Sequence, residues 1–455
     1  MRRWYTIKPF PYLCAALLAN FQLSAQEADR KLLEDPVVSK LLQRLADDEA
    51  RIRSLEARLS SLLPPAAAVP DHGGVTASPV LAPVPTGNGE AKSSPATEPD
   101  SASALAMASM MAGDHDHAME IPGGPVLKFR GFTDLGFGVG QASNHLVFPL
   151  GVPGHSTFTI GEFDLFMSSK ISDHLSFASE LVVGPSPDNS WGLDIERIQL
   201  TYRANPYFEV SGGRYHTAIG YYNTMFHHGT WFQAATGRPF MYLFEDSGGL
   251  LPVHNVGLTA TGLVPGTEKL GLHWIAEVGN GRTSDRNAYT VQNFVADKNR
   301  KSFNVAAYVR PEGVPGLQVG GSIYRDRLYP DTVTPVNQTV ASAYAVYGNS
   351  TWEFLNEGVL LRNASGFNHR VYNTPMMYSQ VSRRFGAYRP YLRYQYVNAI
   401  AGDPVNVYRG KYAGPSFGIR YDLSDYAALK FQYNRINQTG IAALNGLETQ
   451  LAFTF

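Results

Sequence analysis

The chain of 455 residues is nearly free of cysteine and carries no excess of charge of either sign. Its one cysteine, Cys14, excludes a disulfide scaffold and a zinc site built from several thiolates. The 38 Lys and Arg residues are balanced by 39 Asp and Glu residues, which gives a formal net charge of -1. Such a balance argues against a nucleic-acid-binding protein, because that class needs a basic surface to neutralise phosphates.

Long apolar runs are missing as well. Beyond the N-terminal segment, no apolar stretch reaches the roughly 18 residues that a transmembrane helix needs, which excludes a protein with several membrane-spanning helices. The same observation does not exclude a membrane β-barrel, because the strands of a barrel alternate between apolar and polar residues and look polar on average. The chain is instead rich in glycine, with 43 residues, and in aromatic residues, with 12%. This composition indicates many strands and turns.

The N-terminus has the pattern of an export signal. The opening MRRWYTIK carries three positive charges and no negative one, an apolar stretch runs from Pro9 to Leu23, and the small residues Ser24 and Ala25 follow. We therefore predict that residues 1–25 are a secretory signal peptide. An N-terminal membrane anchor is the alternative. Cys14 lies within this segment, so the mature protein would contain no cysteine.

Residues 26–63 contain a heptad repeat. Its seam residues recur at alternating spacings of three and four: Val38, Leu41, Leu45, Asp48, Ile52, Leu55, Leu59 and Leu62. This spacing is typical of the a and d positions of a coiled coil, and Pro64 and Pro65 end the helix. We predict a homo-oligomeric coiled coil such as a trimer. A helix packed on its own domain is the alternative.

Residues 64–125 form a predicted linker rich in Pro, Ala and Ser. Such a segment cannot bury enough surface to offset the entropy of ordering it, so we expect it to be disordered. It contains the tract Asp114-His-Asp-His-Ala-Met-Glu120, in which His115 and His117 could bind a transition metal weakly. A solvated end of a polar linker is the other interpretation, and we predict no structural metal and no cofactor.

From residue 126 onwards the dominant pattern is alternation with period two. In the last strand Leu447, Thr449, Leu451, Phe453 and Phe455 share one face, and the residues between them share the other. Sixteen candidate strands follow this pattern: 126–140, 156–171, 174–184, 192–203, 206–216, 254–264, 268–279, 301–311, 316–326, 338–349, 352–364, 374–385, 388–399, 412–423, 427–437 and 446–455.

The connections between these strands alternate between tight turns and longer loops. A membrane barrel sorts its connections in this way between its two rims, and closure removes the sheet edges that a bilayer cannot tolerate. We therefore predict an all-β fold for residues 126–455: an antiparallel transmembrane β-barrel of about 16 strands, within a range of roughly 14–18. A secreted array of β-sandwiches is the alternative.

The layout of signal peptide, coiled coil, Pro-rich linker and barrel ending in Phe455 resembles that of bacterial outer-membrane porins. Several segments are similar to the phosphate-selective porins O and P and their relatives: Leu127–Asp134, Tyr421–Asp425, Leu429–Tyr433, Gly213–Thr217 and Phe226–Gly229. The resemblance implies a homotrimer in the outer membrane of a Gram-negative bacterium, with the coiled coil and linker in the periplasm. It also implies passive diffusion of ions and small hydrophilic solutes. Phosphate selectivity is not carried over, because we find no match for the basic residues of the phosphate pores.

The longest connection, residues 217–253, is the third long loop by strand count. The third long loop of porins commonly folds into the barrel, so the resemblance implies that this loop narrows the channel. Its eight aromatic residues make it poorly suited to solvent, and its charged residues are Arg238, Glu245 and Asp246. An external lid or a protein-docking loop is the alternative.

Charged residues at inward strand positions and in this loop are candidates for lining the pore. The predicted pore-lining and constriction residues are Arg197, Arg203, Arg238, Glu245, Asp246, Arg389, Arg393, Arg420 and Lys430. Basic residues gather on the late strands and acidic ones on the early strands, so the walls could place a transverse field across the pore. Ion pairs that only solvate the interior are the alternative, and the ion preference stays open.

Few residues suggest chemistry beyond transport. His227 and His228, with His216 and His254, are weak candidates for a metal site in or beside the long loop. We find no phosphate-binding G-x-x-x-x-G-K-[ST] signature, and we predict no catalytic residue and no enzyme. The expected partners are outer-membrane lipid and small solutes or ions, and not nucleic acid. The alternative function is a closed barrel that acts as a receptor, an adhesin or a lipid-active enzyme.

Overall fold

The computed structural model describes residues 125–140, 156–185, 190–226, 229–245, 249–283, 294–296, 298–330, 334–406 and 410–455, and the backbone of 117–119. The chain divides into two compact units, Met1–Ser93 and Ser94–Phe455. All described residues belong to the second unit. The predicted signal peptide, the coiled coil and nearly all of the linker lie outside the described residues, so they stay predictions.

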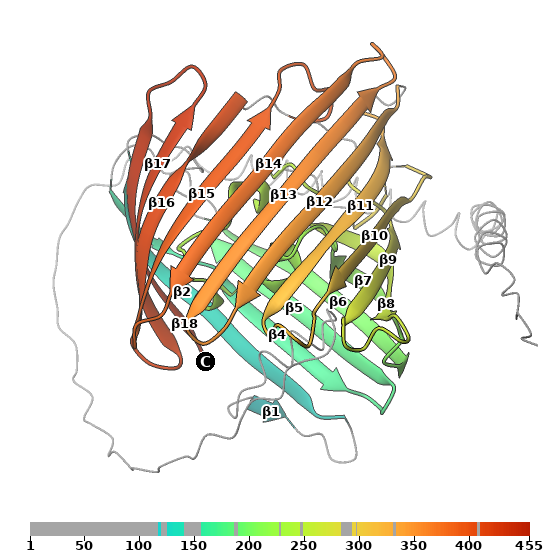
Figure 1. Ribbon diagram of the computed structural model, residues 1–455, viewed down its shortest axis with the longest axis horizontal. Helices are drawn as coiled ribbons and strands as arrows, with labels where there is room; N and C mark the ends of the chain where they lie inside the picture. Colours follow the sequence, from blue (N-terminus) through green and yellow to red (C-terminus); the bar gives the residue numbers. More distant parts are fainter. Residues whose placement is uncertain are drawn as a thin grey trace, which may run out of the picture. The chain divides into compact units, whose positions relative to one another are not determined.

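Antiparallel strands make up most of the second unit and close into a barrel (Figure 1). In chain order they are β1 (His117–Met119), β2 (Leu127–Gly140), β3 (Thr157–Ile160), β4 (Phe163–Lys170), β5 (Leu175–Pro185), β6 (Trp191–Asn205), β7 (Phe208–His216), β8 (His254–Leu263), β9 (Leu272–Gly279), β10 (Ser302–Val309), β11 (Leu317–Leu328), β12 (Val336–Gly348), β13 (Trp352–Ser365), β14 (Val371–Arg383), β15 (Tyr388–Ala399), β16 (Gly410–Asp422), β17 (Ala427–Gln438) and β18 (Leu444–Thr454). Among the described residues, no helix is long and apolar enough to cross a membrane.

The strand count agrees with the prediction. Both β3 and β4 pair with β2, so they form one strand that is interrupted at Gly161 and Glu162. The short β1 pairs only with the start of β2. The closed antiparallel barrel therefore has 16 strands. Each predicted strand is found within a few residues of its expected bounds, because period-two alternation and turn residues both mark it.

The barrel closes between β18 and β2. Their register places Leu451 opposite Leu135, and the backbone of Phe455 exchanges two hydrogen bonds with Gly131, at 2.8 and 3.0 Å. Because β2 begins before its first partner on β18, its start offers unpaired backbone groups, and β1 pairs there with His117 opposite Phe129. Residues 117–119 of the predicted disordered linker are therefore a strand in the structure.

The connections are sorted between the two ends of the barrel. Tight turns follow β4, β6, β12, β14 and β16, whereas longer connections follow β2, β7, β9 and β15. The tight turns lie at the end that carries the C-terminus, at the bottom of Figure 1, and the strand ends that the longer connections join lie at the opposite end. We call these ends the turn rim and the loop rim.

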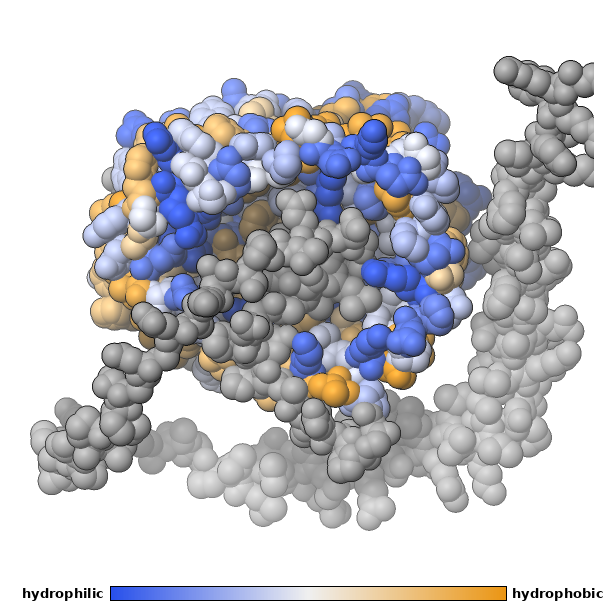
Figure 2. Space-filling model, turned by 60° about the horizontal axis from the view of Figure 1, so that its bottom comes forward, coloured by the Kyte–Doolittle hydropathy of each residue, from blue (hydrophilic) through white to orange (hydrophobic). Residues whose placement is uncertain are grey.

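The two faces of the barrel wall differ in polarity, as the alternation requires. Outward side chains are apolar and accessible: 67% of Leu193, 65% of Val305 and 56% of Leu447 are exposed. Inward side chains include the buried charged residues Glu180 and Lys430. Figure 2 shows the end with the turn rim brought forward, with hydrophilic side chains around the mouth and many hydrophobic ones on the flank. An apolar outside and a charged inside are the pattern of a barrel in a bilayer.

Candidate functional site

The connection between β7 and β8 spans residues 217–253, and we call it the inner loop. Its described residues lie against the inner wall of the barrel. Its described part contains the short helix α4 (Tyr222–Met225) and two 3-10 turns, η1 (Thr230–Phe232) and η2 (Phe240–Tyr242). The turn η1 packs on β2 and β18, and η2 packs on β14 and β15. The inner loop therefore reaches wall strands that are far from its own in sequence.

One side of the inner loop forms an apolar core with the wall. Ile219, Tyr222, Met241, Tyr242 and Leu251 are each at most 1% exposed. They pack in one cluster with inward side chains of β11–β17: Tyr324, Val340, Val346, Leu355, Val359, Leu361, Met376, Tyr378, Val397, Ala399, Tyr412 and Ile436. Burial of a large apolar side chain contributes about 1.5–3 kcal/mol. The apolar side chains therefore hold this part of the inner loop firmly against the wall.

Glu357 on β13 is the hydrogen-bonding centre of that core. Its Oε2 accepts bonds from the backbone N–H of Tyr221 and from the hydroxyl of Tyr242, both at 2.7 Å. Its Oε1 accepts bonds from the backbone N–H of Tyr222 at 2.8 Å and from the hydroxyl of Tyr378 at 2.6 Å. The carboxylate thus satisfies two N–H groups at the start of α4 that have no partner within the helix.

Three basic side chains on β15, β16 and β17 bind the middle of the inner loop. Each donates to backbone carbonyls: Arg393 to Gly237 at 2.7 Å, Arg420 to Trp231 and to Gln233 (3.1 Å), and Lys430 to Thr230 and to Ala235 (3.1 Å). The three side chains belong to residues that are 2%, 6% and 0% exposed. These predicted pore cations therefore face the backbone of the inner loop.

Carboxylates of β2 and β18 bind hydroxyl groups in the same stretch of the loop. Glu448 accepts a bond from the Thr236 hydroxyl at 2.5 Å. Asp134 accepts bonds from the Thr230 hydroxyl at 3.1 Å and from the Gln450 amide at 3.0 Å. Acidic and basic wall residues thus hold neighbouring atoms of one loop segment.

The end of the inner loop meets a buried ionic cluster on β6–β8. His254, the first residue of β8, lies between two carboxylates: its Nδ1 is 2.9 Å from Glu245, and its Nε2 is 2.5 Å from Glu196. Glu196 also pairs with Arg214 at 3.3 Å. Burial raises the pKa of Glu245, but the charge and the hydrogen bonds of His254 outweigh it and bring that pKa below the usual 4.5. Glu245 is therefore ionised at neutral pH and ties the loop to β8.

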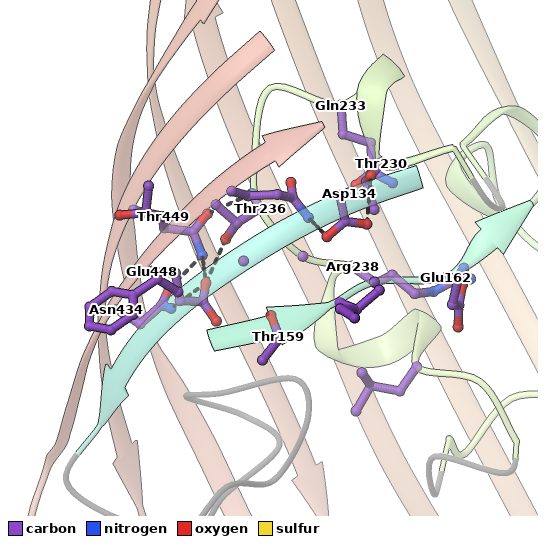
Figure 3. A pocket seen from close by; sticks show the side chains of 18 of the residues that line it. Asp134, Thr159, Glu162, Thr230, Gln233, Thr236, Arg238, Asn434, Glu448 and Thr449 are labelled. Atoms are coloured by element: carbon purple, nitrogen blue, oxygen red, sulfur yellow. Dashed lines mark hydrogen bonds between the residues drawn. The ribbon is translucent and has the colours of Figure 1, made fainter. Parts of the chain in front are cut away.

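A cavity of about 250 Å³ lies between the inner loop and the wall formed by β2, β17 and β18. Figure 3 shows its lining, to which Asp134, Thr236 and Glu448 contribute hydroxyl and carboxylate oxygens. Glu162, in the break between β3 and β4, adds a third carboxylate. The cavity is therefore a polar compartment in which a small hydrophilic solute would find many hydrogen-bonding partners.

Arg238 supplies the loop's own positive charge to this cavity. Its Nε donates to the carbonyl of Tyr242 at 2.6 Å, and its guanidinium lies 3.6 Å from the centre of the Phe244 ring. The stacking and the hydrogen bond fix the side chain in place. Arg238 is thus the predicted constriction residue that the structure places beside open space on the loop side.

Other predicted residues lie on the early strands. Arg197 lines a second cavity of about 60 Å³, where its Nη2 is 2.6 Å from His216 Nδ1 and 3.5 Å from Glu180. Arg203 pairs with Glu209 at 2.6 Å. These ion pairs agree with the interpretation that part of the inward charge solvates the interior.

The remaining predicted residues divide into two groups. Arg389 faces Glu353 at 3.9 Å, and Glu245 is directed towards His254, whose Nδ1 lies 2.9 Å from the carboxylate. Asp246, His115, His227 and His228 lie outside the described residues, and of His117 only the backbone is described. Within the described ranges, no cluster of three or more His, Cys, Asp or Glu side chains could hold a metal ion.

Sequence reasoning missed Glu357 and the Glu196–His254–Glu245 cluster. A signal for Glu357 existed, because it occupies an inward position of β13 between the apolar inward residues Leu355 and Val359. A lone carboxylate in such a row needs a set of donors. No comparable pattern marks Glu196, because an irregular register between β5 and β6 shifts the alternation there.

Comparison with known proteins shows the fold. No protein-family profile and no curated protein sequence matches the chain. The outer-membrane channel DcaP of Acinetobacter baumannii is 11% identical, with a TM-score of 0.53, over 74% of this chain and 99% of that one. An anion-selective porin from Comamonas acidovorans is 12% identical, with a TM-score of 0.52, over 72% and 99%. Salmonella typhi OmpF, in a complex with daunomycin, is 11% identical, with a TM-score of 0.51, over 74% and 100%. The chain therefore has a porin-like barrel fold.

Proposed function

We propose that the protein is an outer-membrane porin that allows passive diffusion of ions and small hydrophilic solutes. The observation that carries this proposal is the closed 16-strand barrel with apolar residues outside and charged residues inside. A bilayer solvates the outer face, and only a hydrophilic path can use the inner face. This function requires no catalytic residue and no cofactor, and it assigns the protein outer-membrane lipid and small solutes as partners.

The finer assignments rest on sequence. The resemblance to the phosphate-selective porins O and P supports membership of that group, without their phosphate preference. The heptad segment 26–63 supports a homotrimer whose coiled coil and linker lie in the periplasm. The signal peptide supports export, and the charge balance of the chain supports a role without nucleic acid.

The inner loop is proposed to form the constriction. It crosses from β7 and β8 to contacts on β14, β15 and β18, so any path through the barrel passes beside it. The cavity that it lines carries Asp134, Glu162 and Glu448 as acids, with Arg238 and Arg393 as bases. Arg393 keeps its charge while it donates to the Gly237 carbonyl, so the acids outnumber the bases by three to two. This distribution favours cations over anions in the cavity, because fixed charges beside a narrow passage act with little screening.

Conductance in planar bilayers tests the proposal. The mature protein, residues 26–455, is expected to insert and give stepwise current increments, and a salt gradient should give a reversal potential on the cation-selective side. Glu162→Gln is expected to reduce that potential, whereas Glu268→Gln, in an exposed turn, is the matched control with no expected change. Stable insertion without any current steps would contradict the channel proposal.

One observation favours the second candidate, a closed barrel that acts as a receptor, an adhesin or a lipid-active enzyme. The inner loop fills part of the lumen with an apolar core in which Tyr242 and Leu251 are 0% exposed. Such packing leaves less room for water than an open channel has. An inserted barrel without current would therefore be assigned to this class.

A further inference from the structure

The outward face of the barrel carries charge of one sign. In the described strands, every Asp and Glu lies on the inner face, as the alternation of burial and the strand pairing assign it. The outward charged residues are all basic: Arg325, Arg327, Arg362, Arg383, Lys411 and Arg435. An outer face without carboxylates cannot neutralise these cations itself, so an anion from outside the barrel would complement them.

Five of these six cations gather at one rim. Arg325, Arg327, Arg362, Lys411 and Arg435 lie near the loop-rim ends of β11, β13, β16 and β17, and we call them the basic arc. The strand register brings two of them together, since Thr339 pairs with both Arg325 on one side and Arg362 on the other. Neighbouring strands at roughly 4.8 Å spacing place these two arginines about 10 Å apart.

The other half of the same rim is different. Outward residues at the loop-rim ends of β2, β3, β6 and β10 are apolar and exposed, namely Val139, Phe158, Trp191, Leu193 and Phe303. Within the described strands, the outward cations of the loop rim are therefore confined to β11–β17. Lys301, just before β10, is exposed and donates to Asn280 at 2.8 Å. A general need for polar residues at a membrane boundary would not separate the two halves in this way.

Four of the five residues of the basic arc are exposed, and Arg327 is half-buried. Arg325, Arg362, Lys411 and Arg435 are all exposed, and within the described residues none of the four forms an ion pair. Lys411 lies 5.6 Å from the Tyr396 ring, and Arg435 donates to Asn445 Oδ1 at 3.3 Å. A lipid-facing arginine costs about 2–4 kcal/mol at the bilayer midplane and roughly 0–1 kcal/mol near an interface. Their place near a rim is thus the one where a lipid headgroup could reach them.

Apolar residues lie directly below the cations on the same strands. Ile323 follows Arg325 towards the turn rim on β11 and is 56% exposed, and Leu360 follows Arg362 on β13 and is 43% exposed. The outer face thus offers cations at headgroup level and an apolar surface at the level of the acyl chains. A free anion would use only the first, whereas an anionic lipid uses both.

We propose that the basic arc binds phosphate-bearing headgroups of anionic lipids in the leaflet at the loop rim. This proposal rests on the proposed function only in that the barrel spans a bilayer. Arg325 and Arg362 hold a headgroup phosphate between them, and the Thr339 hydroxyl lies between the two arginines. Ile323 and Leu360 pack against the acyl chains. Lys411 and Arg435 extend the same surface along the rim.

Lipid retention tests the proposal. The mature barrel is reconstituted in phosphatidylcholine vesicles that contain a minor fraction of diphosphorylated lipid A, extracted gently, and examined for co-purified lipid by native mass spectrometry. The wild type is expected to enrich lipid A over phosphatidylcholine. The double variant Arg325→Gln with Arg362→Gln should reduce that enrichment on the order of tenfold, because each Lys or Arg near a membrane surface adds to the attraction of anionic lipid. Arg383→Gln, at the turn rim, is the matched control and should retain the wild-type enrichment.

The outcomes separate this proposal from the channel function. Channel current is measured in the same vesicles, and it should be unchanged in the double variant because both side chains point away from the lumen. Equal enrichment in the double variant and the control would overturn the lipid site while leaving the channel intact. Displacement of the lipid by millimolar inorganic phosphate would show that the basic arc binds a free anion, and it would also overturn the lipid site. A changed oligomeric state with unchanged lipid retention would assign the arc to a contact between copies of the chain.

Discussion

The wall of the barrel holds the inner loop at two places by opposite chemistry. At Glu357 the wall supplies a carboxylate and the loop supplies donors, namely the backbone N–H groups of Tyr221 and Tyr222. On β15–β17 the wall supplies cations and the loop supplies carbonyl oxygens. We call these the acidic dock and the basic dock.

The difference follows from what the loop backbone exposes at each place. The start of a helix presents unpaired N–H groups, and α4 begins at Tyr222 beside Glu357. The stretch around η1 instead turns its carbonyls outward to the wall. A loop inside a lumen cannot leave such groups unpaired. The acidic dock lies in the apolar core, whereas the basic dock borders the cavity, so we expect the acidic dock to be the firmer attachment.

The largest expected effect is the loss of the acidic dock. Glu357→Ala leaves four buried donors without an acceptor, and such a loss costs about 3–5 kcal/mol. Urea unfolding in micelles, followed by tryptophan fluorescence, measures it. Glu353→Ala is the matched control on the same strand, because its carboxylate is more accessible and its Arg389 partner is 3.9 Å away. A control that loses as much stability as Glu357→Ala would remove the distinction between the docks.

A smaller effect is expected at Gly220, which brings the loop up to Glu357. Its φ is +78°, and a Cβ there would lie 1.7 Å from the Tyr242 hydroxyl oxygen and 2.4 Å from Glu357 Oε2. Gly220→Ala should therefore lower the free energy of unfolding by about 2 kcal/mol, in addition to the cost of placing a non-glycine residue in a left-handed backbone conformation. Gly440→Ala isolates that strain, because its φ is +82° and no atom lies within 4 Å of its Cβ. Equal unfolding midpoints for the two variants would show that the close approach is relaxed in solution.

The sequence predicts the wall far better than the docks. The alternation of Leu447 to Phe455 is visible in five residues and needs no partner to be recognised. The same alternation on β17 places Lys430 on the inner face, where the structure has it buried. The partners of Lys430 on the inner loop could not be predicted, because they are backbone carbonyls, which leave no mark in the side-chain pattern. Its partner on the wall is the Gln450 side chain, at 2.9 Å. The same holds for the loop carbonyls that Arg420 binds and for the N–H groups on Glu357, although Arg420 also pairs with the Asp422 side chain at 2.6 Å.

At the basic dock a single substitution should cost less than at the acidic dock. Lys430→Met removes a donor to the carbonyls of Thr230 and Ala235 but also relieves a buried charge, so we expect a loss of about 1–3 kcal/mol. The middle of the loop should move more freely, which is measured as noisier and larger single-channel currents. Lys269→Met, at an exposed turn, is the control and should leave the current unchanged. A quiet, unaltered channel in Lys430→Met would mean that the apolar core alone positions the loop.

The smallest effect concerns pH, at the attachment of the loop end to β8. The pKa of Glu245 lies below 4.5. The group in contact with it is His254 on β8, and the charges of Arg238 and Arg282 also act on it. A carboxyl whose pKa is lowered by folding contributes stability above its unfolded pKa and loses it as pH falls through the folded value.

The single-channel current should therefore show a step below pH 4.5, where Glu245 takes up a proton and releases the loop end. In Glu245→Gln that step should be absent, and the loop end should already be loose at pH 7. The pKa of Glu268 is also lowered, but that residue is fully exposed in a turn, so Glu268→Gln should keep the wild-type profile. A step below pH 4.5 that persists in Glu245→Gln would show that another group controls the attachment of the loop end.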